Sequence, residues 1–359
     1  REWSASRQVI KDNELERWIR RSLSDDARAA AVGTATKAVI GIGTGSASSL
    51  EDRLLSKGLM PLDHQAPLRY KQIAARIQGL AADFAVNYND ENRRQVFAEL
   101  ITHKLPQAWI ESQPHARADI LTHARTYDLM ALHLGKPRIG YGLERVVYAL
   151  NPNWPCQSPL LRNDYVAELS HLLPALDRLA REGKTDRPPI DWHIAGFVSA
   201  RMKAAPDRAF SELTHEEDKA IYNLGLVRLL ADVQQSAGPV SLPYLAGWCA
   251  ELLQPVGEKY RNRGRREQMM RALKDLALKG NIPALIALAD NPNRERADAE
   301  GFHKAKKEFA ALVEQMNWLR DGGLTKPAVV KVIAREASSI VSSVIAAVAV
   351  LLITLSSVF

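Results

Sequence analysis

Three residues at a regular spacing have the chemistry of metal ligands. His115, Asp119 and His123 lie four positions apart, so on a helix all three project from one face. Imidazole and carboxylate groups bind zinc or iron, but a tetrahedral site needs more ligands, for which nearby sequence offers only Asp128 and His133. A solvated polar stripe explains the same spacing. We therefore predict no metal and no cofactor, and keep the first three residues as weak metal candidates.

The dipeptide His215-Glu216 begins a pattern that is typical of zinc proteases. Those enzymes need a second histidine four positions after the first, and this chain has Lys219 there. Thr214 and Glu217 instead fit a capping box, which accounts for acidic residues at a helix start. We predict the beginning of a helix here rather than a catalytic site.

Three glycines, Gly41, Gly43 and Gly45, stand in a stretch of small residues. A phosphate-binding loop has the pattern G-x-x-x-x-G-K-[ST], with the lysine after the glycines, whereas Lys37 precedes them. The glycine loop of protein kinases, G-x-G-x-x-G, also differs from the G-x-G-x-G spacing found here. We predict that residues 33–61 form a flexible linker of small residues.

A carboxylate and an imidazole also occur close together, at Asp191 and His193. Near neighbours on a helix point apart, so we predict that Asp191 caps a helix and that His193 is a partly buried polar residue. Cys156 and Cys249 have no evident base beside them, and two distant cysteines are typical of a reducing compartment. No catalytic motif follows from these residues, and whether the chain belongs to an enzyme stays open.

The stretch 258–279 is the most basic part of the chain, with eight cations against three acids. Such a run is usually a solvated helical face. Binding of phosphate on a lipid head group or on nucleic acid is the alternative. The candidate phosphate-binding residues are Arg261, Arg263, Arg265, Arg266 and Arg271.

Apolar residues recur at helical spacing along most of the chain, and no convincing run of alternating β-branched residues interrupts them. We therefore predict an all-α protein, an irregular array of amphipathic helices followed by one C-terminal transmembrane helix. The predicted helices cover residues 12–32, 70–84, 96–105, 115–134, 143–150, 166–179, 192–202, 217–233, 245–256, 269–276, 283–289 and 302–319.

The C-terminal stretch, residues 340–359, contains no charged residue. A helix that crosses a hydrocarbon core of roughly 30 Å needs about 20 mostly apolar residues, and this stretch has that length. Lys326, Lys331 and Arg335 precede it, against the single acid Glu336. Because Lys and Arg gather on the cytoplasmic side of a span, we expect the residues before it to lie in the cytoplasm.

Composition changes suggest five segments. A Pro-rich loop after residue 150 marks a seam between two helical parts. The segments are residues 1–32, a helix that belongs to an upstream domain; the linker 33–61; a first helical subdomain, 62–150; a second helical subdomain, 151–325; and 326–359, the juxtamembrane segment and transmembrane helix. The chain begins with Arg1 rather than Met, so we expect it to be part of a longer protein.

Three stretches together resemble a known family. They are LDHQAPLRY at 62–70, GLER at 142–145 running into YALNP at 148–152, and WPCQSPLL at 154–161. They resemble the C-terminal region of large proteobacterial membrane proteins with a serine/threonine protein-kinase-like domain at the N-terminus. The kinase lysine of V-A-I-K, the H-R-D loop and the D-F-G metal ligand are absent here. The resemblance implies that phosphoryl transfer, if any, resides upstream of Arg1, and that this chain is a non-catalytic spacer and tether.

These observations predict a membrane-tethered helical interaction or regulatory region in the bacterial inner membrane. Its predicted partners are the lipid bilayer and either another protein or the upstream domain of the same chain. The alternative is a membrane-associated nucleic-acid-binding protein that uses the basic residues 258–279.

Overall fold

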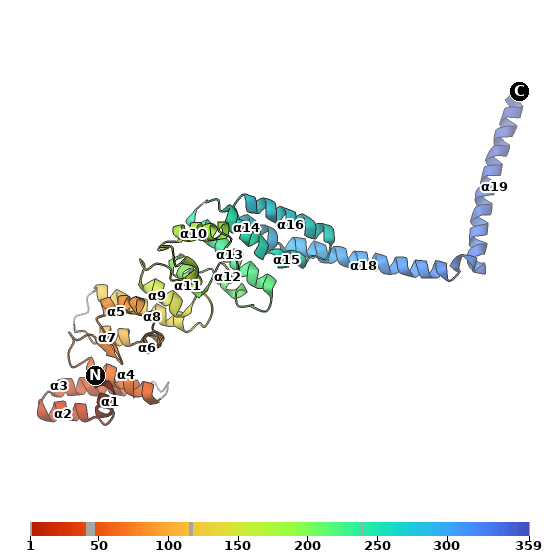
Figure 1. Cartoon of the computed structure of the whole chain (residues 1–359). Coiled ribbons are helices and arrows are strands. Elements are labelled where there is room, and N and C mark those ends of the chain that lie inside the picture. Colours follow the sequence, from red (N-terminus) through yellow and green to blue (C-terminus); the bar gives the residue numbers. More distant parts are fainter. Residues whose placement is uncertain (1, 41–46, 115–117, 239, 359) are drawn as a thin grey trace. The chain divides into compact units, whose positions relative to one another are not determined.

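The computed structural model describes residues 2–40, 47–114, 118–238 and 240–358 (Figure 1). Within these ranges the chain is mostly helical, with almost no strand, which confirms the predicted all-α class with one terminal helix long and apolar enough to span a membrane. The elements, in chain order, are α1 (Trp3–Lys11), α2 (Glu14–Ser22), α3 (Asp26–Ile40), α4 (Ala47–Leu59), β1 (Leu68–Tyr70), β2 (Ile73–Ala75), α5 (Ile77–Val86), α6 (Glu91–Thr102), α7 (Leu105–Glu111), α8 (Ala118–Leu134), α9 (Gly142–Leu150), η1 (Pro159–Leu161), α10 (Leu169–Arg181), α11 (Trp192–Arg201), α12 (Asp207–Glu212), α13 (Lys219–Ala237), α14 (Pro243–Leu252), α15 (Gln254–Glu258), α16 (Arg263–Leu278), α17 (Ile282–Ala289), α18 (Pro292–Arg320), η2 (Gly323–Thr325) and α19 (Pro327–Val358).

The chain divides into two compact units. The first, here called the body, comprises Arg1–Lys259 and Glu267–Asp290. The second, the C-terminal unit, comprises Tyr260–Arg266 and Asn291–Phe359. This division differs from the predicted segments, since the predicted boundary between residues 150 and 151 falls inside the body.

The prediction of a flexible linker at 33–61 was wrong for the residues that the structure describes there. Those residues lie in α3 and α4 and the turn after α4, and the two helices pack against each other and against α1 and α2. Small residues allow the close packing, because a Cβ on Gly58 would lie 2.3 Å from Ile10 Cδ1. The described part of the predicted segment 1–32 likewise forms α1, α2 and the start of α3 within this packed group. The glycines at 41, 43 and 45 lie outside the described residues.

A short hairpin replaces part of the helix predicted over 70–84. Strands β1 and β2 pair antiparallel with Tyr70 opposite Ile73, and Lys71 in the tight turn has a left-handed φ of 50°. The Tyr70 hydroxyl donates to Glu99 Oε2 at 2.9 Å, which fixes the hairpin against α6. Spacing alone could not separate the two structures, because Tyr70 and Ile73 are buried in either.

The predicted seam after residue 150 is a packed junction within the body. Helices α9 and α11 lie so close that a Cβ on Gly196 would be 2.7 Å from Glu144 Cβ and 2.9 Å from the Arg145 backbone nitrogen. The rings of Tyr148 and Phe197 meet edge to face at 5.4 Å across the same junction. The contact between the Tyr148 and Phe197 rings joins the two predicted subdomains, and the lack of a side chain at Gly196 lets α9 and α11 pack closely.

The C-terminal unit consists mainly of α18 and α19 (Figure 1). In α18, all of whose residues are described, only Asp298 is buried. Its carboxylate accepts the backbone N–H groups of Arg261 at 2.8 Å and Asn262 at 3.2 Å. The turn after α18 has Gly323 against Trp318, where a Cβ would lie 2.4 Å from the indole ring.

Candidate functional site

Helix α19 is long and apolar enough to cross a membrane. Its 32 residues include an apolar stretch, Pro327–Leu355, whose most apolar window has a mean hydropathy of 2.4 and no buried residue. At about 1.5 Å per residue, that length exceeds a hydrocarbon core of roughly 30 Å. Large side chains such as Ile345 and Leu352 are each 62% exposed. Such a surface is unfavourable in water, and by its length and composition α19 could span a membrane.

The hydroxyl groups within α19 do not oppose this environment. Ser342 Oγ donates to the Ser338 carbonyl at 2.7 Å, and Ser343 Oγ donates to the Ser339 carbonyl at 2.8 Å. Thr354 Oγ1 likewise bonds the Val350 carbonyl at 2.9 Å. Each hydroxyl is thus satisfied inside the helix, which lowers the cost of transfer into lipid.

The N-terminal turns of α19 carry the charges that the sequence placed beside the span. Lys326, Lys331, Arg335 and Glu336 are all exposed. Residues 337–355 of the same helix contain no charged residue. The charge therefore changes abruptly along one continuous helix, with Lys331, Arg335 and Glu336 in its first turns and no charged residue from 337 to 355.

Several of the predicted phosphate-binding arginines have partners within the C-terminal unit. The Arg261 guanidinium lies 4.6 Å from the centre of the Phe302 ring, and Arg266 Nη2 donates to the Tyr260 carbonyl at 2.8 Å. Arg265 Nη1 lies 4.0 Å from Asp298 Oδ1. These contacts give the arginines a role in holding the residues before α16 near the start of α18.

The other two candidate arginines, Arg263 and Arg271, are exposed on α16. Arg271 Nε is 3.4 Å from the carbonyl of Glu267, one turn earlier, which is a weak contact on the helix's own surface. Both side chains lie on an exposed part of α16. Binding of phosphate by the five arginines stays a prediction.

Only part of the proposed metal-binding set lies among the residues that the structure describes. His115 lies outside the described residues, while Asp119 and His123 fall on α8. Asp128 instead pairs with Lys104 at 3.2 Å and accepts from Gln107 at 3.2 Å. Among the residues that the structure describes, no group of three or more His, Cys, Asp and Glu side chains could hold a metal ion.

His133, the other proposed supporting ligand, is buried in the body. Its ring centre lies 5.8 Å from that of Tyr141, and its buried Nδ1 has no hydrogen-bond partner among the residues that the structure describes. Burial, with Arg145 and Lys136 nearby, lowers the pKa of His133 to about 4. His133 is therefore a neutral core residue at neutral pH.

A polar network that sequence reasoning missed lies at the junction of α9 and α11. Tyr148 Oη is 2.9 Å from His193 Nδ1 and accepts the backbone N–H of Gln157 at 2.8 Å. Burial raises the pKa of the Tyr148 hydroxyl and lowers that of His193, so both groups are neutral near pH 7. Spacing could not reveal this pair, because 45 residues separate the two side chains.

The same network confirms one local prediction and fixes the Pro-rich loop. Asp191 caps α11 by accepting the Ile194 N–H at 2.8 Å, and it also accepts from Ser158 Oγ at 2.6 Å. Burial raises the pKa of the Cys156 thiol to about 12, which makes it a packed thiol rather than a nucleophile. Arg201 Nη1 donates to the Tyr148 carbonyl at 2.7 Å. These groups bind one another, so the network, here called the clasp, holds the Pro-rich loop against α9 and α11.

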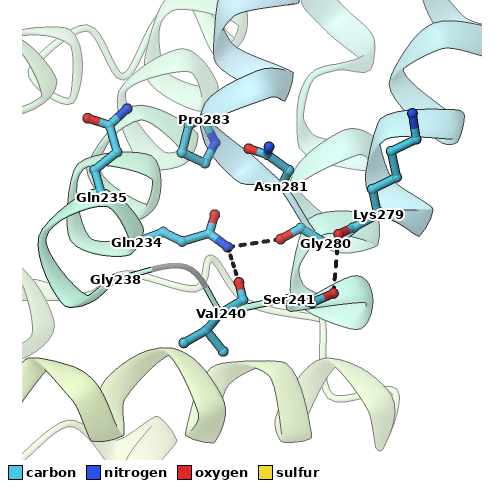
Figure 2. A pocket seen from close by; sticks show the side chains of 9 residues that line it. All are labelled: Gln234, Gln235, Gly238, Val240, Ser241, Lys279, Gly280, Asn281 and Pro283. Carbon is cyan, nitrogen blue, oxygen red and sulfur yellow. Dashed lines mark hydrogen bonds between the residues drawn. The ribbon is translucent and has the colours of Figure 1, made fainter.

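A cavity of about 560 Å³ lies where α13, the loop after it and the start of α17 meet. Figure 2 shows the side-chain amide of Gln234 between Val240, in the loop after α13, and Gly280, just before α17. Its Nε2 donates to the carbonyls of Val240 at 2.5 Å and Gly280 at 2.9 Å, and its Oε1 accepts the Ile282 N–H at 2.9 Å. The Gln234 amide, which forms part of the polar wall of this cavity, therefore has a structural role: it holds the surrounding backbone in place.

Comparison of the chain with protein-family models, with curated proteins and with solved structures gives no match. Inference of function therefore depends on the physical properties of α19, the arginine contacts and the clasp.

Proposed function

We propose that this chain is a helical interaction module held on a membrane by α19. The observation that carries the proposal is the exposure of the apolar stretch Pro327–Leu355, of which no residue in its most apolar window is buried. Transfer of apolar surface out of water is worth roughly 25 cal/mol per Å², so a helix with this surface partitions strongly into lipid.

The proposed orientation places the body in the cytoplasm. The exposed cations Lys326, Lys331 and Arg335 at the start of α19 support it, because Lys and Arg beside a span are retained on the cytoplasmic side. The two free, buried cysteines, Cys156 and Cys249, agree with a reducing compartment. The proposed location is the bacterial inner membrane.

The resemblance to membrane proteins with an upstream kinase-like domain belongs to the same proposal. Residues of the three resembling stretches contribute to packing: Tyr148, Gln157 and Ser158 form the clasp, and the Ala66 carbonyl accepts from Trp109 Nε1 at 3.1 Å. Structural roles for these residues support the proposal of a non-catalytic spacer, with any catalysis in another domain. The proposed partners are the bilayer and a second protein or domain.

Nucleic-acid binding by the basic residues 258–279 is the weaker proposal. Arg261, Arg265 and Arg266 contact Phe302, Asp298 and the Tyr260 carbonyl, and binding phosphate would require some of these contacts to break. Replacing Arg263 and Arg271 with Ala tests it without disturbing those contacts. Salt-sensitive RNA or DNA binding that this double variant weakens would support the weaker proposal.

Protease accessibility tests the membrane proposal and its orientation together. The full chain is expressed in bacteria with an epitope at its N-terminus, and spheroplasts and inside-out membrane vesicles are treated with protease. We expect the epitope to be protected in spheroplasts and lost in inside-out vesicles. Loss in spheroplasts would overturn the orientation, and recovery of the chain in the cytosol would overturn the tether.

A further inference from the structure

A cavity of about 420 Å³ lies within the body, where α4, α7 and α8 meet the turn between α6 and α7. Its wall carries three cationic side chains, Arg53, Lys57 and Lys104, and the imidazole of His103. Sites that bind small organic molecules have volumes of roughly 300–1,000 Å³, so this cavity, here called the α4 cavity, is large enough to hold one.

Two of the cations lie on consecutive turns of α4. Arg53 and Lys57 are four residues apart, so both project from one face of the helix. Arg53 is only 5% exposed, and Lys57 is half-buried. Like charges at this spacing repel each other, and removal of each from water carries a further cost. Negative charge between the two side chains offsets both costs.

The acidic residues of the cavity wall do not pair with Lys57. Asp128 instead binds Lys104 at 3.2 Å and accepts from Gln107 Nε2 at 3.2 Å. Glu111 is exposed and forms no ion pair with Lys57. Within the described wall of the cavity, the Lys57 ammonium group therefore has no acidic partner at ion-pair distance.

The electrostatics of the α4 cavity also favour an anion. Burial lowers the pKa of Lys57, an effect that Glu111 opposes and Arg53 reinforces. Burial, together with the charge of Arg53, lowers the pKa of His103 as well. Both basic groups are thus harder to charge than in water, and a bound anion reverses this. Titratable groups perturbed by burial and by a neighbouring charge, in one cleft, are typical of ligand sites.

We propose that the α4 cavity binds a small organic molecule through a phosphate group that Arg53 and Lys57 hold. A guanidinium offers paired N–H donors that match phosphate oxygens, and a lysine adds a point charge. Two cations suit the nearly two negative charges of a phosphate monoester better than the single charge of a carboxylate. Val39, Ala108 and Ala124 form an apolar part of the wall, which accommodates the carbon skeleton.

Calorimetric titration of the full chain, purified in a detergent without phosphate, tests the site with glycerol phosphate as the probe. We expect saturable binding that is roughly tenfold or more weaker in Lys57→Gln, since hydrogen bonds to charged groups are among the stronger ones. Lys57→Arg, which keeps the charge, should retain most of the affinity. Lys274→Gln, at an exposed position of α16, should bind like the unmodified chain.

The unmodified chain provides a second measurement that does not depend on the folding of a variant. Lysine side chains are acetylated with and without saturating glycerol phosphate, and mass spectrometry follows each site. We expect Lys57 to react severalfold more slowly when the probe is bound and Lys274 to react at the same rate. Equal acetylation of Lys57 in both samples would overturn the site.

Two further ligands identify what the cavity recognises. Acetate tests for general attraction of anions, and micelles containing phosphatidic acid present the same phosphate monoester on a lipid. Binding of glycerol phosphate, with or without binding of phosphatidic acid, supports the proposal where Lys57 is protected. Equal affinity for acetate, binding of phosphatidic acid alone, unchanged affinity in Lys57→Gln, or no binding of glycerol phosphate would overturn it.

Discussion

The carboxylate of Asp298 accepts the backbone N–H of Arg261 at 2.8 Å, and this bond links α18 to a chain segment 37 residues earlier. Asp298 is the buried residue of α18, and its other oxygen accepts the Asn262 N–H at 3.2 Å. Hydrogen bonds from backbone N–H groups to a charged acceptor are among the stronger ones in proteins. This contact fixes α18 to the segment before α16 within the C-terminal unit.

Replacing Asp298 with Ala should therefore loosen the residues that it caps. We expect the amides of Arg261 and Asn262 to exchange with solvent roughly tenfold faster or more, since each lost bond to a charged group is worth about 1.5–3 kcal/mol. Hydrogen exchange measured by mass spectrometry checks this. Glu300→Ala, at an exposed position of the same helix, is the control, and equal exchange in both variants would contradict the cap.

Two arginines that share the same two carboxylates should differ greatly in their effect on stability. Buried Arg228 bonds Glu212 at 2.7 Å and Asp290 at 2.8 Å, while Arg208, largely exposed, bonds the same groups at 3.2 and 2.6 Å. Arg228→Ala should cost about 1.5–3 kcal/mol, because it removes two charged hydrogen bonds made by a buried guanidinium to half-buried carboxylates. Arg208→Ala should cost about 0–1 kcal/mol. Thermal unfolding in mild detergent compares them, and similar midpoints would refute the distinction.

Stability should decline in mild acid because of His133. Its folded pKa of about 4 lies below the ordinary value of 6.5, so the unfolded chain takes up the proton at higher pH. Its contribution is fully present above pH 6.5 and is lost as the pH falls toward 4. His133→Gln should make the unfolding midpoint less dependent on pH over this range. His171→Gln, at an exposed position, should leave the pH dependence unchanged. An unchanged slope in His133→Gln would exclude this histidine as the cause.

Two glycines inside helices should respond in opposite directions to alanine. At Gly196 a Cβ would meet Glu144 and the Arg145 backbone within 3 Å, so Gly196→Ala should destabilise the body by about 1–3 kcal/mol. At Gly247 nothing lies within 4 Å of a new Cβ, so Gly247→Ala should stabilise by about 0.5–1 kcal/mol. Unfolding midpoints measure both effects. Two changes of the same sign would mean that α9 and α11 are less closely packed than described.

Sequence patterns located helices well where apolar spacing coincided with a clear cap. Helix α11 begins at Trp192 after the predicted cap Asp191. The capping box predicted at Thr214 was wrong, because α13 begins at Lys219 and Asp218 is its cap. Several neighbouring acids and hydroxyls can each serve as caps, and tertiary packing selects among them.

Tertiary contacts were beyond the reach of sequence patterns. The left-handed turn at Lys71 produces a hairpin from residues whose spacing also fits a helix. The linker prediction failed because small residues such as Gly58 serve close packing as well as flexibility. The pairing of Tyr148 with His193 depends on which elements meet, and apolar spacing does not encode this.

The central claim is that α19 prefers lipid to water, and extraction of bacterial membranes with alkaline carbonate tests it most directly. We expect the full chain to stay in the pellet. Val348→Arg with Leu351→Arg should release it, since each arginine in a span costs about 2.5–3.5 kcal/mol. The control Val86→Arg with Leu278→Arg, at exposed positions of the body, should stay in the pellet. Release of the unmodified chain into the supernatant would contradict the membrane tether.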